Sequence, residues 1–222
     1  VEPGRVGATA LRSNLPVQGT LSNIASQQTW TFDAQPAARI TVTALAAMRS
    51  PTLNVAVRVL APDGREVASN DDHGTLLLMN PNDALLTTQL VEGGRYAIVV
   101  SAVSGEGRYT LGLNVAQPLT PDDAEVTGTL QDAIPQQSWQ LNGQAGQQLT
   151  LTMLAQSGNL DPQLRLLGPD GVLLAENDDA RDPALGRNAQ LVDVVLPADG
   201  VYIIEAARFG GEGRYTLQVE RN

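Results

Sequence analysis

Two acidic loops of the same composition hold the residues with the clearest chemical potential. Adjacent carboxylates repel each other by about 1 kcal/mol at 4 Å in water, and a hard cation with oxygen ligands relieves that repulsion. The candidate calcium ligands are Asn70, Asp71 and Asp72 in the first loop, Asn177, Asp178 and Asp179 in the second, and Asp161 and Asp182 on either side of the second loop. The alternative is that these residues only form turns, because Asn and Asp side chains accept backbone hydrogen bonds there.

The chain offers no group of residues for catalysis. His73 is the only histidine, and there is no cysteine. A hydrolytic triad needs three groups on separate elements so that each can orient the next, whereas the acidic neighbours of His73 lie in its own loop. We therefore expect no enzymatic activity and no catalytic residues.

The composition limits the classes of partner. The chain of 222 residues is 42% hydrophobic, and its 14 basic against 24 acidic residues give a net charge of -10. Such a charge opposes binding to phosphate backbones, so nucleic acid is not an expected partner. The sequence has no stretch of 18 apolar residues, which argues against membrane insertion. The first residues lack the pattern of a signal peptide, so we expect any export signal to have been removed from this chain.

The two halves of the sequence repeat each other. Gly19-Thr20-Leu21 recurs at 128–130 and Gln27-Gln28-x-Trp30 at 136–139, both at an offset of 109 residues. Pro62-Asp63-Gly64 recurs at an offset of 107, and Gly-Glu-Gly-Arg-Tyr-Thr-Leu at an offset of 106. Landmarks in the same order with so little drift indicate a duplicated globular module of about 100 residues.

Within each module, apolar and polar residues alternate. Ile40, Val42 and Ala44 are separated by threonines, as is typical of half-buried strands. Fuller apolar runs that begin at Tyr96 and Tyr202 predict central strands. Turn residues such as Pro-Asp-Gly separate the strands. The sequence therefore predicts an all-β fold of two tandem antiparallel β-sandwiches, jelly-roll-like, with about eight strands each.

Glycines and aromatic residues also recur in pairs. The segment 105–108, Gly-Glu-Gly-Arg, precedes a strand rather than a helix, so we interpret it and its copy as hairpin turns and not as phosphate-binding loops. Six of the eight aromatic residues fall at matching positions of the two copies: Trp30 and Trp139, Tyr96 and Tyr202, Tyr109 and Tyr215. We expect these six in the cores, which leaves few rings on which a sugar could stack.

The ordered set of motifs resembles a known family. Gln-Gln-x-Trp, Leu160-Asp161-Pro162, Pro-Asp-Gly, Asn-Asp-Asp and Gly-x-Gly-x-Tyr-Thr-Leu follow one another as in the bacterial pre-peptidase C-terminal (PPC) domain family. The resemblance covers both modules and is closer in the second. It implies secreted, non-catalytic jelly-roll modules appended to extracellular peptidases and other exported proteins, related to the collagen-binding domains of clostridial collagenases. It also implies calcium, because some relatives bind that ion.

A segment precedes the first repeat, so the expected organisation is an N-terminal segment over 1–18, a first PPC-like module over 19–117 and a second over 118–222. Leu11, Leu15 and Val17 are the candidate anchors of the N-terminal segment. They could dock it on its own module, wedge it between the two modules, or add it as a strand to the open sheet edge of a neighbouring subunit.

Two functions agree with these features. The first is a non-catalytic extracellular module that binds, targets or spaces within a secreted or cell-surface bacterial protein, with a protein or extracellular-matrix partner and calcium as a stabilising ion. The alternative is a structural subunit that self-assembles into an extracellular filament or surface layer through its sheet edges and N-terminal segment.

Overall fold

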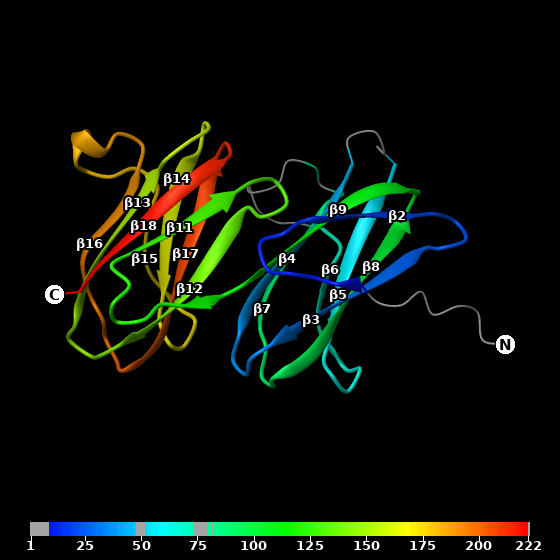
Figure 1. Ribbon diagram of the computed structural model, residues 1–222, viewed down its shortest axis with the longest axis horizontal. Helices are drawn as coiled ribbons and strands as arrows, with labels where there is room; N and C mark the ends of the chain where they lie inside the picture. The colour runs from blue at the N-terminus through cyan, green and yellow to red at the C-terminus, as the bar shows by residue number, and fades with distance from the viewer. Residues whose placement is uncertain (1–8, 48–51, 73–79, 81, 222) are drawn as a thin grey trace. The chain divides into compact units, whose positions relative to one another are not determined.

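The chain forms two compact units, Val1–Val115 and Ala116–Asn222. The computed structural model describes residues 9–47, 52–72, 80 and 82–221, and each unit is a pair of facing β-sheets (Figure 1). The predicted fold class, all-β with two antiparallel sandwiches, is confirmed. His73 lies outside the described residues. Within the described ranges, no helix is long and apolar enough to cross a membrane.

The first sandwich has a five-stranded sheet in the order β1-β3-β8-β5-β6 and a four-stranded sheet in the order β2-β9-β4-β7. Its strands are β1 (Thr9–Ala10), β2 (Val17–Leu21), β3 (Gln27–Ala34), β4 (Arg39–Ala46), β5 (Asn54–Leu60), β6 (Glu66–Asn70), β7 (Ala84–Gln89), β8 (Gly94–Ser104) and β9 (Gly107–Val115).

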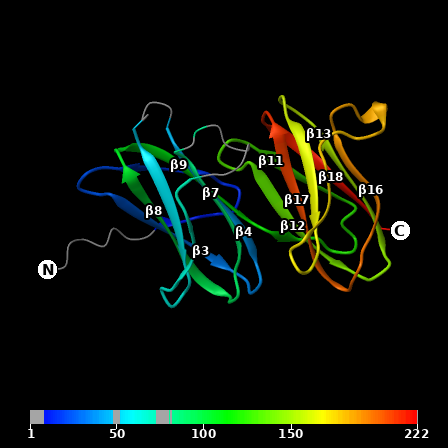
Figure 2. The same cartoon turned by 180° about the vertical axis from the view of Figure 1, so that it is seen from behind.

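The second sandwich repeats this order as β10-β12-β17-β14-β15 and β11-β18-β13-β16, and Figure 2 shows the strands from behind. Its strands are β10 (Gln117–Pro118), β11 (Glu125–Leu130), β12 (Gln136–Gly143), β13 (Gln148–Ala155), β14 (Asp161–Leu167), β15 (Leu173–Asn177), β16 (Ala189–Val195), β17 (Gly200–Gly210) and β18 (Gly213–Arg221), with a 3-10 helix at Pro183–Leu185. The two-residue strands β1 and β10 pair in parallel with β3 and β12, and all other described pairs of named strands are antiparallel.

Each sandwich encloses its own apolar core, as the alternating pattern requires. In β5, Val55, Val57 and Val59 are fully buried while the residues between them are half-buried. The fuller apolar runs form β8 and β17, which lie in the middle of their five-stranded sheets, as predicted.

The described part of the N-terminal segment packs on its own sandwich. Leu11 is buried in the first core and donates its backbone N–H to the Thr31 carbonyl at 2.7 Å. Val17 begins β2 and packs against the same core, whereas the side chain of Leu15 is exposed. The second sandwich has the same lead-in, since Leu119 follows β10 and is buried as Leu11 is. The repeated unit therefore begins at β1, before the Gly-Thr-Leu motif.

The glycine-rich segments are turns, but they are not hairpins. Gly105 adopts φ +71° between β8 and β9, and these two strands belong to different sheets of the sandwich. Gly211 does the same between β17 and β18. The hairpin prediction was wrong because a short turn rich in glycine can also carry the chain from one sheet to the facing one. True hairpins occur at Pro-Asp-Gly, where Gly64 and Gly171 have positive φ.

Candidate functional site

The repeated aromatic residues form a polar network inside each sandwich. In the first, Trp30 donates its ring N–H to the Tyr109 hydroxyl at 2.8 Å, and Tyr109 donates to Gln28 Oε1 at 2.6 Å. In the second, Trp139, Tyr215 and Gln137 make the same two bonds at 3.1 and 2.8 Å. The motifs Gln-Gln-x-Trp and Gly-x-Tyr-Thr-Leu are therefore structural, because buried polar atoms must be hydrogen-bonded.

These tyrosines predict a loss of stability in alkali. Burial raises the pKa of Tyr109 to about 12 and that of Tyr215 further, although the hydrogen bonds from Trp30 and Trp139 lower both pKa values slightly. Because an unfolded tyrosine ionises near pH 10, the unfolded chain loses protons first. The contribution of these two tyrosines to the free energy of unfolding should be constant below pH 10 and fall as the pH rises toward 12. Urea titrations from pH 8 to 11.5 measure this, and Tyr109→Phe with Tyr215→Phe should flatten the dependence. An equal slope in that double variant would contradict the assignment.

The first acidic loop follows edge strand β6. Asn70 is the last residue of the strand, and its side-chain oxygen is buried with no hydrogen-bond partner in the described part of the chain. Asp71 and Asp72 come next and are exposed. The loop thus presents two solvated carboxylates beside one buried amide oxygen.

The second acidic loop uses several of its oxygen atoms within the fold. Asn177 Oδ1 accepts the backbone N–H of Gln190 at 3.1 Å, and Asp182 Oδ1 accepts that of Ala184 at 2.9 Å as the cap of the 3-10 helix. Asp161 begins β14, and its Oδ2 lies 3.5 Å from Nη1 of Arg187. Asp178 is half-buried and Asp179 exposed.

The candidate ligands do not gather into one site. Among residues 9–47, 52–72, 80 and 82–221, no three histidine, aspartate or glutamate side chains come together as a metal ion would require. Capping and ion pairing occupy the oxygens of Asp182 and Asp161. Calcium binding stays a prediction.

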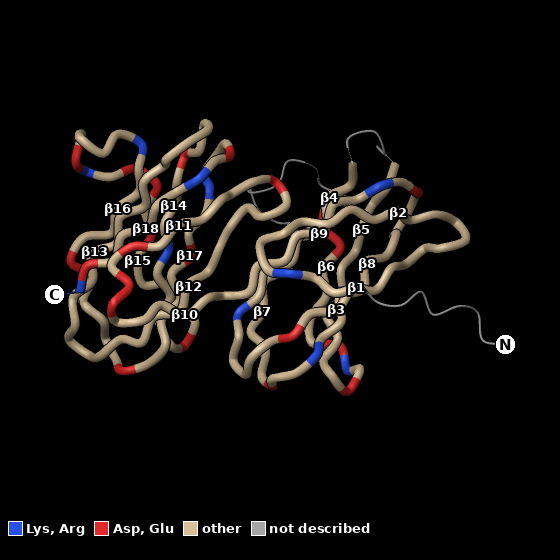
Figure 3. The backbone as a smooth tube through the Cα atoms, in the orientation of Figure 1, with Lys and Arg blue, Asp and Glu red and all other residues tan. Residues whose placement is uncertain are grey.

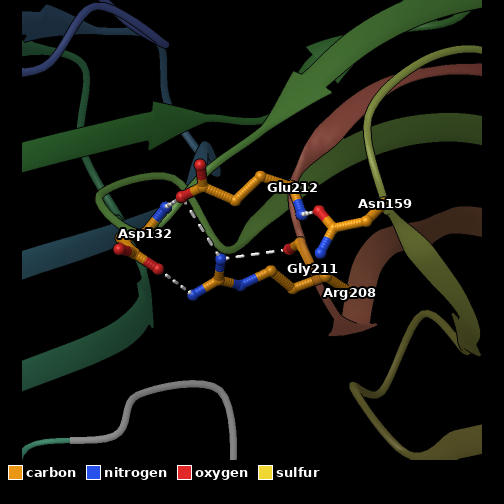
Figure 4. A network of polar contacts seen from close by, with 5 residues as sticks. All are labelled: Asp132, Asn159, Arg208, Gly211 and Glu212. Carbon is orange, nitrogen blue, oxygen red and sulfur yellow. Dashed lines mark hydrogen bonds and ion pairs between the residues drawn. The ribbon is translucent and has the colours of Figure 1, made fainter.

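Arg208 connects three segments at one end of the second sandwich (Figure 4). Its Nη2 lies 2.7 Å from Asp132 Oδ1, and its Nη1 donates to the Gly211 carbonyl at 3.2 Å and lies 3.6 Å from Glu212 Oε1. Glu212 in turn accepts the backbone N–H of Asp132 and donates its own N–H to Asn159. The guanidinium is 10% exposed, so this is a buried structural contact rather than a free binding group.

The most distinctive surface is an apolar edge of the second sandwich. We use "apolar edge" for five exposed side chains, Val172, Leu173, Leu174, Val192 and Val195. They lie in or beside β15 and β16, which are the last strands of their two sheets and contact each other. Val172 is 57% and Val192 59% exposed, so this side of the sandwich presents aliphatic surface to solvent.

Strand β6, the described counterpart of β15 in the first sandwich, does not carry this apolar surface. Counted from the Pro-Asp-Gly turn, Arg65 and Glu66 take the places of Val172 and Leu173. Arg65 lies 3.8 Å from Asp63, and Glu66 lies 3.9 Å from Arg58, so the equivalent side carries ion pairs. Charged edge strands discourage pairing with other chains, whereas extended apolar ones favour it.

The net charge is also unequal between the two units. The first 115 residues contain nine acidic residues and eight arginines, and residues 116–222 contain fifteen acidic residues and six arginines. Figure 3 shows acidic segments on many loops of the second unit, including the loop between β15 and β16. The apolar edge therefore lies in the unit that carries most of the negative charge.

The apolar edge was not predicted from the sequence, although the two copies differ there. Aligning the two copies places Val-Leu-Leu against Arg-Glu-Val directly after the repeated Pro-Asp-Gly. The difference becomes meaningful only with the knowledge that these residues lie on an edge strand, which the order of strands in the sheet determines.

Comparison with known proteins gives a family for the second unit. Residues 136–208 match the family model of the bacterial pre-peptidase C-terminal domain. No curated protein matches the chain. Among solved structures, the pre-peptidase C-terminal domain of a collagenase from Bacillus anthracis is 16% identical, with a TM-score of 0.41 over 50% of this chain and 99% of that one. PliG of Salmonella Typhimurium, a periplasmic inhibitor of g-type lysozyme, is 17% identical, with a TM-score of 0.35 over 49% and 98% of the two chains.

The family match covers β12 to most of β17. It agrees with a non-catalytic, binding-type module, and the first sandwich repeats the same order of strands. Residues 136–208 of the chain thus match the bacterial pre-peptidase C-terminal domain family, and the resemblance predicted from the sequence is confirmed there.

Proposed function

We propose that this chain is a non-catalytic, protein-binding region of a secreted or cell-surface bacterial protein, and that it binds through the apolar edge of its second sandwich. The observation that carries the proposal is the contrast between the two copies of one fold. One copy covers its edge with ion pairs, and the other exposes Val172, Leu173 and Leu174 at the same place.

The apolar edge has the properties of a binding surface. Exposed aliphatic side chains gathered in one place mark sites of protein contact, whereas singly scattered ones do not. The edge of a sheet also offers unpaired backbone N–H and C=O groups to an incoming strand. An edge that combines both features favours a protein ligand over a small polar molecule.

Site-specific cross-linking tests the proposal. A photo-reactive amino acid at position 173 should form adducts with proteins of the cell surface or extracellular matrix, because it lies within the proposed contact. The same amino acid at position 66 is the matched control, since Glu66 takes the equivalent place on the first edge. We expect at least fivefold more adduct at 173, which corresponds to about 1 kcal/mol of preference.

A second pair of variants separates binding from chance proximity. Val172→Arg with Leu174→Glu, in the chain labelled at 173, should remove the adducts while circular dichroism shows an unchanged fold. Equal labelling at positions 66 and 173, or labelling that survives the charged substitutions, would contradict the proposal.

Two earlier expectations stay predictions. Calcium stabilisation is supported only by the acidic loops and the family resemblance. Self-assembly into a filament or surface layer is the other. Among the described residues, no contact favours self-assembly over binding to another protein. The extracellular location is supported by the family match of the second unit.

A further inference from the structure

A row of alternating charges crosses the outer face of the second sandwich and ends at the apolar edge. Glu205 on β17 stands directly opposite Arg165 on β14, and Arg165 stands directly opposite Glu176 on β15. Arg165 donates from Nη1 to Glu205 at 3.2 Å, and its Nε lies 3.5 Å from Glu176 Oε2. We call this row the charge ladder.

The charge ladder ends at the edge strand on Glu176, whose carboxylate pairs with Arg165 and is open to solvent. Glu205 is 1% exposed, Arg165 37% and Glu176 54%, so solvent exposure rises strand by strand toward β15. Arg165 lies between the two glutamates, and the exposed side of Glu176 faces away from it toward the open edge. The next position in the pattern is a cation on the strand that would lie beyond β15.

The first sandwich has no such ladder. The equivalent residues across β8, β5 and β6 are Val99, Arg58 and Ser69, in the same registers. Arg58 instead pairs with Glu66 at 3.9 Å, two pairs further along the strands. Among the described residues, the ladder and the apolar edge therefore occur together in the second unit and are both missing from β6 and its neighbours.

A strand added to β15 would continue both patterns. Side chains of a strand alternate between its two faces, so every second residue of the added strand would lie on the outer face with Glu176. The residues between would face the sandwich interior, the side on which Ala175 packs against the core. Oppositely charged residues that stand directly opposite each other on neighbouring strands attract.

We propose that the β15 edge binds an extended segment of a partner protein in which apolar and polar residues alternate and a lysine or arginine stands opposite Glu176. This inference rests on the proposed function and specifies the chemistry of the partner. The excess of nine acidic over basic residues in residues 116–222 favours the same cationic ligand at longer range.

A second copy of this chain fits the edge less well. The five residues of β15 include one glutamate and no basic residue. Pairing two β15 strands would therefore leave the charge ladder without its cation, and both copies carry the acidic excess of the second unit. Charge complementarity thus selects a partner that is basic where β15 is acidic.

Two synthetic peptides test the proposal against the whole chain. Each has nine residues that alternate valine and threonine, with either lysine or glutamate at the central outward position. Backbone N-methylation along one edge prevents the peptides from pairing with themselves. Fluorescence anisotropy should show the lysine peptide binding about fivefold more tightly at low salt, within the range of cross-strand charge pairs.

Changes at position 176 should alter the preference in a defined order. Glu176→Gln should make the two peptides bind equally, and Glu176→Lys should favour the glutamate peptide. Glu66→Gln removes a similarly exposed carboxylate from the first edge and should leave both affinities unchanged. A thermal melt of each variant checks that the fold is retained.

Three results would overturn the inference. Equal binding of both peptides to the unaltered chain would mean that the edge does not distinguish a positively from a negatively charged residue in its ligand. No peptide binding, together with adducts at position 173, would leave the proposed function standing with another kind of ligand. Concentration-dependent dimers in sedimentation that disappear with Val172→Arg would make a second copy the occupant.

Discussion

Replacing Gly128 with alanine should strongly destabilise the second sandwich. A Cβ atom at this position would overlap Gln137 Oε1 and lie against the ring of Tyr215, which is fully buried. Neither partner can move without breaking the hydrogen bonds of the Gln-Tyr-Trp network. We expect a loss of about 3 kcal/mol or more, since overpacking and an unsatisfied buried polar group add.

Hydrogen exchange read by mass spectrometry measures this effect for each sandwich separately. In Gly128→Ala, the protection of backbone amides from exchange should fall in peptides of residues 116–221. Gly19→Ala should produce the same change in the first unit, where Tyr109 and Gln28 occupy the equivalent space. Gly210→Ala is the control, because its new Cβ would meet only Asp161 Cβ at 4.0 Å. Equal protection in Gly128→Ala and Gly210→Ala would show that the network is not tightly packed.

Removing Arg208 should produce the second largest loss. Its guanidinium bonds Asp132 and the Gly211 carbonyl and is 10% exposed, whereas Asp132 and Glu212 can return to solvent (Figure 4). Charge-assisted hydrogen bonds contribute about 1.5–3 kcal/mol each, and part of that is recovered when the carboxylates are hydrated. We therefore expect Arg208→Ala to cost about 2 kcal/mol in urea unfolding.

Arg208→Met separates packing from charge in this network. Methionine keeps an aliphatic stem of similar reach, and an arginine stem also contributes by packing. If the ion pairs matter most, Met and Ala should destabilise the second sandwich alike. A methionine variant as stable as the unaltered protein would show that the aliphatic stem alone is important. The first sandwich has Ala102 at the equivalent place, so alanine itself is compatible with the fold.

The fold could be predicted from the sequence where local pattern and global structure agree. The alternation of Val55, Val57 and Val59 depends only on which side of a strand faces the core, and it was interpreted correctly. The turn at Gly105 was interpreted wrongly as a hairpin. The φ preference of glycine indicates that the chain changes direction there, but not which sheet the next strand joins. The two-residue parallel strand β1 carries no periodic signal and was also missed.

The candidate site was harder to predict for a related reason. The Asn-Asp-Asp loops were proposed as calcium ligands from their composition alone. Of the two candidate ligands outside these loops, Asp182 caps the 3-10 helix and Asp161 forms an ion pair with Arg187. The apolar edge consists of ordinary aliphatic residues, whose significance comes from their position on the last strand of a sheet. Glu205, Arg165 and Glu176 lie far apart in the sequence and meet only through the registers of three strands.

The contrast between the β6 and β15 edges also determines how many subunit contacts this side of the fold can make. A subunit needs two complementary contacts to extend an open chain, whereas a single self-complementary contact closes after two copies. Of these two equivalent edges, one is occupied by ion pairs and one is apolar, so this side of the fold supplies a single contact. Association through β15 would therefore end at a pair, and growth into a filament would need another contact of different chemistry elsewhere on the chain.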